Sequence, residues 1–263
     1  MSEAAATAPA QQPRQSVTVR IQGLRKSYAG ADVLKGINFE VQRGEVFVMM
    51  GPSGSGKTVL LKHIIGLEPP DEGDIFIEGE SIQSKEVSSK YRMALVFQSG
   101  ALLNSLNVLE NVGLYLSEHR LKKPDEIARI ATEKLELLGL KNVKDRFPSE
   151  LSGGMKKRVA IARALVIEPQ LILYDEPTSE LDPLSADVIG EEILDLSKRI
   201  DVTSIVVTHD RDLAFGIADR IAMMYEGEII AIGTVEEIKR HPHPVIHRFL
   251  SADFRPNHQR EQP

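Results

Sequence analysis

The chain has 263 residues, of which 42% are hydrophobic and 27% are charged, and this suits one large globular domain or a core with an inserted subdomain. A net charge of −6 argues against a nucleic-acid surface, so no nucleic acid is expected as a partner. The absence of cysteine excludes disulfides and thiolate metal sites, and no apolar run approaches the roughly 18 residues of a membrane-spanning helix.

A disordered leader is predicted over residues 1–16, because this stretch lacks the charged start and apolar middle of a signal peptide. The ordered chain is expected to start near Val17. Alternating or continuously apolar segments then predict strands at 17–22, 33–41, 45–50, 73–79 and 91–98. Between them, residues 59–67 have the apolar spacing of a helix.

From Ser99 to about Leu165 the pattern becomes helical, with helices predicted over 107–119, 124–140 and 156–167. Strand patterns return at 170–176, 203–210, 220–227 and 228–233. Strands that alternate with helices favour a parallel sheet, so the predicted fold class is α/β with a helical insert. Residues 241–263 form a tail with one short helix candidate at 245–250.

The segment "GPSGSGKT" matches the phosphate-binding pattern G-x-x-x-x-G-K-[ST] and stands between a buried strand and a helix, as that pattern requires. Its predicted nucleotide ligands are Gly51, Pro52, Ser53, Gly54, Ser55, Gly56, Lys57 and Thr58. The glycines allow backbone N–H groups to point at phosphate oxygens. Lys57 is expected to reach the β- and γ-phosphates of ATP, and Thr58 to bind Mg²⁺.

Three apolar strands end in polar residues that belong at one edge of the sheet. Asp175 and Glu176 end the strand "LILYDE"; Asp175 is a predicted Mg²⁺ ligand, and Glu176 is predicted to polarise the attacking water. His209 ends "SIVVTH" and is predicted to contact the γ-phosphate. Gln98 ends "MALVFQ" and is expected among both the nucleotide and the Mg²⁺ ligands. Each alone would be an ordinary strand-end residue, so the prediction depends on their convergence.

The order of these motifs resembles the nucleotide-binding subunits of ABC transporters, over about residues 17–240, with the helical subdomain at about 99–165. The segments that carry the resemblance are Tyr28, the loop 51–58, Gln98, "LSGGM", "LILYDE", "SELD" and His209. It implies a P-loop NTPase (RecA-like) parallel-sheet core, an N-terminal antiparallel β subdomain and an inserted α-helical signature subdomain.

The resemblance also implies a head-to-tail dimer of two copies of this chain. Ser152, Gly153 and Gly154 would then face the γ-phosphate of the ATP bound by the partner, since a helix start offers free N–H groups and a positive dipole end. Tyr28 would stack on adenine. Ser179 and Asp182 would lie at the dimer interface.

Short segments resemble one branch of this family more closely, the ATPases of Mla-like, Mce-type lipid transporters. They are Met155 where most members have glutamine, "FQSGAL", and "HRFL" near the end. This branch implies permease subunits, a small regulatory subunit, a lipid-binding Mce-domain protein, and a cytoplasmic location, peripheral on the inner face of the inner membrane. The alternatives are the motor of an amino-acid or other small-solute importer and a non-transport ABC ATPase clamp.

Three further features are interpreted with this family in mind. Leu102, Leu103 and Leu106 form an apolar face that is expected to contact a permease. Glu180 departs from the usual alanine or glycine and adds a charge near the dimer interface. The histidines at 241, 243 and 247 are not expected to bind metal, because the neighbouring prolines impose an extended chain and no acid supports them; a terminal helix that docks on the partner is preferred.

Overall fold

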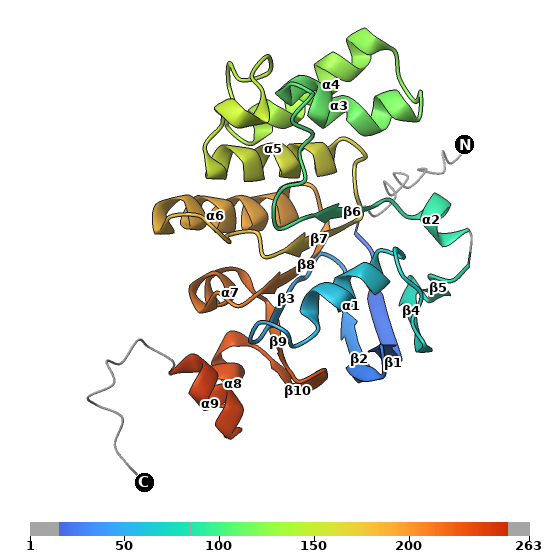
Figure 1. Cartoon of the computed structure of the whole chain (residues 1–263), viewed down its shortest axis with the longest axis vertical. Helices are drawn as coiled ribbons and strands as arrows, with labels where there is room; N and C mark the ends of the chain where they lie inside the picture. Colours follow the sequence, from blue (N-terminus) through green and yellow to red (C-terminus); the bar gives the residue numbers. More distant parts are fainter. Residues whose placement is uncertain (1–15, 85, 252–263) are drawn as a thin grey trace, which may run out of the picture.

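The computed structural model describes residues 16–84 and 86–251, which form two sheets with helices around them (Figure 1). Residues 1–15 of the leader predicted at 1–16 and the end of the tail at 252–263 lie outside the described residues. Ser16, which the prediction placed in the leader, is 4% exposed and donates a 3.0 Å hydrogen bond to Asp201. Ser16 is therefore packed against the rest of the chain.

The smaller sheet is antiparallel and has the strand order β2-β1-β4-β5. Its strands are β1 (Val19–Tyr28), β2 (Ala31–Val41), β4 (Glu72–Ile77) and β5 (Glu80–Ser81). The predicted strand at 17–22 is part of a longer strand. The N-terminal antiparallel subdomain expected from the family resemblance is present.

The larger sheet has the strand order β10-β9-β3-β8-β7-β6. Its strands are β3 (Val46–Met50), β6 (Met93–Val96), β7 (Leu171–Asp175), β8 (Thr203–Thr208), β9 (Arg220–Tyr225) and β10 (Glu228–Gly233). Five of them run parallel, whereas β10 pairs with β9 in the antiparallel sense. The reason is the two-residue turn Glu226–Gly227, whose φ angles of 47° and 82° suit a tight hairpin.

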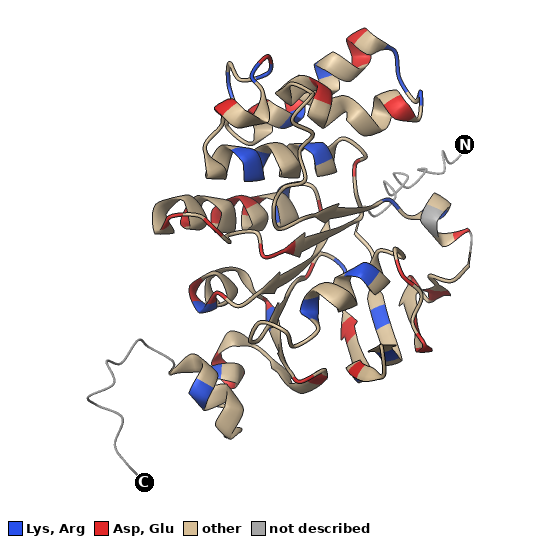
Figure 2. Ribbon diagram, viewed as in Figure 1, with Lys and Arg blue, Asp and Glu red and all other residues tan. Residues whose placement is uncertain are grey.

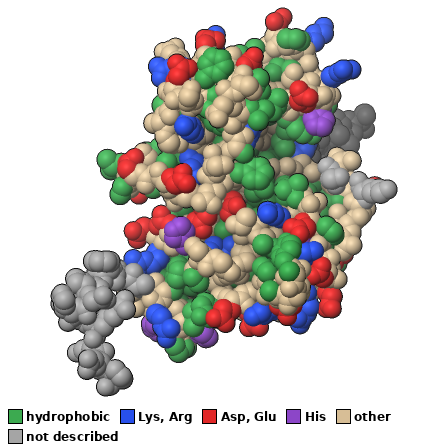
Figure 3. All heavy atoms as spheres, in the orientation of Figure 1, with side chains coloured by type: hydrophobic (Ala, Val, Ile, Leu, Met, Phe, Trp, Pro, Cys, Tyr) green, Lys and Arg blue, Asp and Glu red, His purple; other side chains and the backbone are tan. Residues whose placement is uncertain are grey.

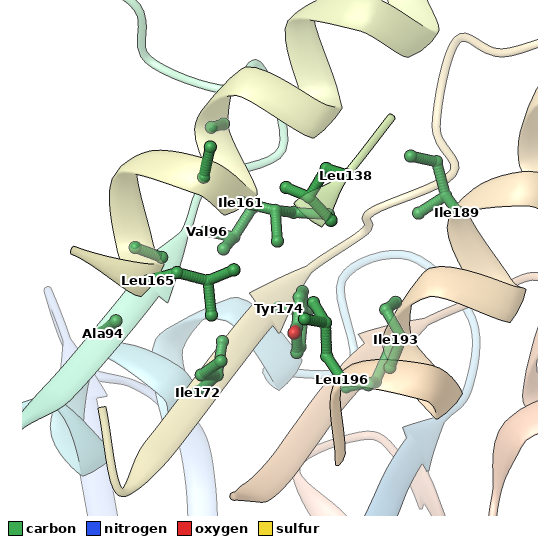
Figure 4. Close-up of a cluster of buried hydrophobic side chains, with 14 of the residues drawn as sticks. Ala94, Val96, Leu138, Ile161, Leu165, Ile172, Tyr174, Ile189, Ile193 and Leu196 are labelled. Atoms are coloured by element: carbon green, nitrogen blue, oxygen red, sulfur yellow. The ribbon is translucent and has the colours of Figure 1, made fainter. Parts of the chain in front are cut away.

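Alternate residues of the parallel strands face two separate cores, because successive side chains of a strand point to opposite faces. Val48 and Met50 of β3 belong to the core under α5 and α6, whereas Phe47 and Met49 belong to the core shared with α1 and the antiparallel sheet. Figure 4 shows part of the first core, where Ile172 and Tyr174 of β7 meet Ile161 and Ile193. Both faces of the sheet are covered, which explains why these strands are apolar throughout.

Helices connect the strands and form the predicted insert. They are α1 (Lys57–Ile64), α2 (Val87–Lys90), α3 (Val108–Glu118), α4 (Pro124–Leu137), α5 (Gly153–Leu165), α6 (Pro183–Arg199), α7 (Arg211–Ile217), α8 (Val235–Lys239) and α9 (Pro244–Leu250), with a short 3-10 turn at Pro148–Glu150. The helices α3, α4 and α5 pack together at one end of the molecule (Figure 1). None of the helices within 16–84 and 86–251 is long and apolar enough to cross a membrane.

Helices α2, α6, α7 and α8 have no counterpart among the predicted segments, and two of the predicted helices differ in a way that bears on function. Helix α5 starts at Gly153 rather than 156, because the Ser152 hydroxyl caps it by accepting from the Met155 N–H at 3.3 Å. Helix α9 docks on its own chain: Ile246 is fully buried in the core that also holds Ile238 of α8. The predicted contact of this helix with a partner is therefore not needed to cover its apolar face.

Candidate nucleotide-hydrolysis site

The phosphate-binding segment forms the turn between β3 and α1, as the pattern predicts. Gly54 and Gly56 have φ angles of 82° and 102°, a region that glycine enters at little cost. Gly51 is required for a different reason, because a Cβ there would lie 2.1 Å from the carbonyl oxygen of Met224. The loop can therefore keep this path only with glycine at these positions.

Lys57 is buried beneath the loop, with 5% of the residue exposed. Its ammonium donates to the carbonyls of Gly51 at 2.7 Å and Pro52 at 2.9 Å, and it lies 3.9 Å from Glu176 Oε1. Burial lowers the pKa of Lys57, and the charges of Glu176 and Asp175 oppose that shift. A cation held in this way at the start of α1 suits a polyphosphate.

The side chains of Thr58 and Asp175 place two oxygens together beside the phosphate loop. The Thr58 hydroxyl donates to Asp175 Oδ1 at 2.9 Å. Burial raises the pKa of Asp175, while the Thr58 hydrogen bond lowers it. Two neighbouring ligands of an octahedral Mg²⁺, each at about 2.1 Å, lie about 3.0 Å apart, so this oxygen pair fits the ion. No group of three or more His, Cys, Asp or Glu side chains gathers in the described part of the chain, so phosphate, water and the predicted ligand Gln98 would supply the other ligands.

Glu176 is held by its backbone and by His209. Its φ of 47° lies in the left-handed region, which costs a non-glycine residue about 1–3 kcal/mol. Its N–H donates to the Val207 carbonyl at 2.9 Å. Its carboxylate Oε2 accepts from the His209 N–H at 3.2 Å and lies 2.9 Å from His209 Nδ1. The carboxylate is therefore fixed beside Lys57, and His209 Nδ1 is turned toward it.

These strand-end residues share one cleft with the phosphate loop. The cleft has a volume of about 320 Å³ and is lined by Val33, Ser53, Gly54, Gly56, Lys57, Thr58, Val59, Gln98, Glu176 and His209. The predicted convergence of the three strand ends is thus observed in the geometry. Val33 of β2 and Val59 of α1 are lining residues that the sequence reasoning missed, since an isolated valine in a strand or helix carries no functional signal.

A larger groove of about 430 Å³ between α6 and α7 is unsuited to a nucleotide. Asp187, Glu191, Asp210 and Asp212 line it, and these carboxylates would repel phosphate. Over the face in Figure 3, acidic and basic side chains are otherwise interspersed with apolar ones. The electrostatics therefore favour the smaller cleft, where Lys57 lies.

Tyr28 lies at the end of β1 and is not among the residues that line the cleft. It is 38% exposed, and the Lys26 ammonium is 5.4 Å from its ring centre. Desolvation, followed by interactions with Glu68, raises the pKa of Tyr28 to about 12. An exposed ring is available for stacking, and its role toward adenine stays a prediction.

The residues of the second phosphate-binding segment lie apart from this cleft. Ser152 and Gly153 are exposed at the start of α5, and Ser152, Gly153 and Gly154 are absent from the cleft lining. They adjoin the start of α6, since a Cβ on Gly153 would be 3.1 Å from Leu181 and one on Gly154 would be 3.5 Å from Ser185. An exposed helix start with free N–H groups can bind a phosphate that another molecule presents.

The surroundings of this segment include two residues singled out from the sequence. Asp182 caps α6 by accepting from the Ser185 N–H at 3.0 Å, so it has a structural role in its own chain. Glu180 is exposed, with a φ of 65°. A glycine would adopt that conformation without strain.

The sheet, the phosphate loop and the strand-end carboxylates define a P-loop nucleoside triphosphatase. A family model described as ABC transporter matches residues 34–179, and the chain belongs to this family. It is an ATP-binding and ATP-hydrolysing motor of a transporter, as the motif order predicted.

Relatives that are named for different transported substances resemble the chain to similar degrees. The probable ribonucleotide transport ATP-binding protein mkl of Mycobacterium leprae is 38% identical, over 90% of this chain and 69% of that protein. The chloroplastic protein TRIGALACTOSYLDIACYLGLYCEROL 3 of Arabidopsis thaliana is 39% identical, over 90% and 74%. The sulfate/thiosulfate import ATP-binding protein CysA of Bacillus cereus is 40% identical, over 89% and 66%.

Solved cassettes share the fold. A nucleotide-free ATP-binding cassette of an ABC transporter superposes with a TM-score of 0.79 and 30% identity, over 90% of this chain and 100% of that one. A dimeric cassette in a post-hydrolysis state, bound to ADP and Pi, gives 0.75 and 32%, over 82% and 98%. The predicted fold class is confirmed.

Proposed function

We propose that this chain powers a transporter that moves phospholipid or another lipid between membranes, and that it hydrolyses ATP at two sites shared by a pair of copies. The ATPase site is inferred from one observation. Four side chains converge at the phosphate loop: Lys57, Asp175, Glu176 and His209. The lipid assignment is supported by Met155 in the signature segment and by a relative named for a galactolipid.

Each catalytic residue has one role in the proposed mechanism. The loop N–H groups and Lys57 bind the β- and γ-phosphates. Thr58 and Asp175 would hold Mg²⁺, which supplies neutralising charge to the phosphates when bound. Glu176 accepts a proton from the attacking water as the water oxygen bonds to the γ-phosphorus and the bond from that phosphorus to the β,γ-bridging oxygen breaks. His209 keeps the carboxylate in place and offers its other ring nitrogen to the γ-phosphate, while Gln98 completes the Mg²⁺ and water contacts.

The second copy closes the site. Ser152, Gly153 and Gly154 of one chain would bind the γ-phosphate held by the other, and their exposure at a helix start supports this. Ser179 and Asp182 would lie where the two copies meet. ATP would join the copies, and hydrolysis would release them.

The proposed permease contact lies on the helical insert. Leu103 is 46% exposed, while Leu106 helps to line a groove with Leu109, Leu114 and Ile127. Leu102, by contrast, packs partly into the chain's own core, so it adds less to this surface. An apolar groove between α3 and α4 of the helical insert would receive a short helix of a membrane subunit. The chain would then lie on the cytoplasmic face of the inner membrane, with a regulatory subunit and an Mce-domain protein in the same assembly.

A small-solute importer is the second candidate, because relatives named for sulfate and for iron import are about equally similar to this chain. The two candidates are distinguished by purifying the tagged chain with its membrane subunits and measuring ATPase activity with added phospholipid vesicles or with added sulfate, ribonucleotide or amino acid. Bound and stimulating phospholipid supports the lipid transporter. Stimulation by a small solute alone contradicts it.

The site itself is tested by two substitutions. Lys57→Ala should abolish ATP binding, because among the described residues Lys57 is the lysine or arginine that lines the cleft. Glu176→Gln should bind ATP and hold a closed dimer, while hydrolysis falls by orders of magnitude. Both are measured by titration calorimetry, dimer size and phosphate release. Normal hydrolysis by Glu176→Gln would show that the base is misassigned.

A further inference from the structure

Lys157 is a buried cation on α5, one turn after the helix start that is proposed to bind the partner's ATP. Only 6% of the residue is exposed. Its ammonium donates to the carbonyl of Gln98, to the carbonyl of Glu176 at 3.4 Å and to the hydroxyl of Ser179 at 3.2 Å. Two of these three acceptors belong to residues of the hydrolysis site.

The chemistry of an ammonium group suits this arrangement. Lysine has three N–H donors on one atom, and here each faces a different acceptor. Those acceptors come from different segments: the end of β6, the end of β7, and the loop that leads into α6. One nitrogen therefore joins the helical insert to two strand ends of the core.

The bond to Glu176 is important because of that residue's backbone. A φ of 47° is a conformation that the surroundings must hold in place. The Val207 carbonyl binds the N–H of Glu176, and Lys157 binds its carbonyl. The carboxylate direction follows from this peptide geometry, so losing Lys157 would free the backbone on one side of the base.

Charge distribution supports the same reading. Figure 2 shows basic residues along α5 and acidic residues on the neighbouring α6. Burial lowers the pKa of Lys157, whereas the charges of Glu180, Glu176 and Asp175 raise it. The charge of the Lys157 ammonium is thus balanced by the carboxylates of Glu180, Glu176 and Asp175 together.

We propose that Lys157 is a positioning residue for ATP hydrolysis. Its ammonium fixes the positions of Gln98, Glu176 and Ser179 relative to one another around the cleft. The inference depends on Glu176 as the base in the proposed function. ATP affinity should not depend on Lys157, because its ammonium bonds neither to the phosphate loop nor to Lys57.

The test is Lys157→Met in the full chain, which keeps the buried stem and removes the donors. We expect kcat to fall about 10-fold to 100-fold, which is the loss that a displacement of about 1 Å in a catalytic group can cause. KM for ATP should stay within about twofold. Lys157→Arg should recover part of kcat, since it restores charge and donors in a different geometry. An unchanged kcat, or a KM that rises in parallel with the loss, would overturn the proposal.

Arg163→Met is the matched control. Its guanidinium lies on the same helix and donates at 2.7 Å to the carbonyls of both Gly100 and Ala101, close to Gln98. It does not contact Glu176 or Ser179. We expect Arg163→Met to lower thermal stability yet leave kcat within about threefold. A loss of kcat equal to that of Lys157→Met would mean that both residues act only by anchoring the loop that follows Gln98.

Two more variants keep the test decisive. Ser179→Ala removes one acceptor and should lower kcat without changing KM, even if Lys157→Met does not fold. An unchanged kcat counts against the proposal.

The ATPase rate of Glu176→Gln is measured in the same assay. If it hydrolyses normally, the proposed function fails; if it is inactive while Lys157→Met is normal, only the role of Lys157 fails.

Discussion

Replacing Glu192 with glutamine should stabilise the protein at alkaline pH and leave its stability unchanged in acid. Glu192 lies on α6 with 17% of its side chain exposed, and its Oε2 has no hydrogen-bond partner. Arg158 of α5 is 4.0 Å away, too far to offset burial. Desolvation therefore raises the pKa of Glu192 from 4.5 to about 7, and Arg158 opposes the shift.

The magnitude follows from linkage between protonation and folding. The unfolded chain loses this proton near pH 4.5 and the folded chain only near pH 7, so stability falls as pH rises from 4.5 to 7. At about 1.36 kcal/mol for each tenfold change in acid dissociation, the full effect is about 3.4 kcal/mol. Solvent screening of the partly exposed carboxylate reduces the expected value to about 2 kcal/mol.

The assay is urea unfolding of wild type and Glu192→Gln at pH 4 and pH 8. The variant should match the wild type at pH 4, below the unfolded pKa of 4.5, and exceed its free energy of unfolding by about 2 kcal/mol at pH 8. Glu191→Gln, an exposed position on the same helix, controls for the loss of one charge. A difference between wild type and Glu192→Gln that does not change with pH would refute the reasoning.

Two further predictions concern backbone positions. Gly51→Ala puts a Cβ 2.1 Å from the Met224 oxygen and should cost about 3 kcal/mol or more, whereas Gly54→Ala meets nothing within 4 Å and should cost only the φ penalty of about 1–2 kcal/mol. Melting temperatures and ATP binding compare them, and equal losses would contradict the clash. Glu180→Gly relieves a φ of 65° and removes an exposed charge from the loop that leads into α6, where the two copies are proposed to meet, so it should strengthen the ATP-bound dimer. Unchanged dimer affinity by light scattering would dispose of that idea.

The phosphate loop and the buried strands could be predicted from the sequence because their physical requirements are local. Gly51, Lys57 and Thr58 occur at a fixed spacing between an apolar strand and a helix. The strand ends at Asp175 and His209 converge because parallel strands meet at one edge.

Other features depend on tertiary packing that no local pattern shows. Lys156 and Lys157 are adjacent and alike in sequence, yet only Lys157 is buried. The difference arises because Ser152 starts the helix, which fixes which side chains of α5 face the core. The docking of Ile246 likewise requires α8 to be in place. These contacts join segments that are distant in sequence, so periodicity cannot reveal them.

Helix α5 joins two functions that the sequence motifs describe separately. Its start, at Ser152 and Gly153, is exposed, while Lys157 one turn later bonds inward to Gln98 and Glu176 of its own chain. A helix transmits a displacement of its start along its length because its backbone hydrogen bonds are continuous. In the proposed dimer, a partner's phosphate bound at the start of α5 would therefore act on the base of the other site. The proposed arrangement would make hydrolysis at the two sites mutually dependent without any additional element.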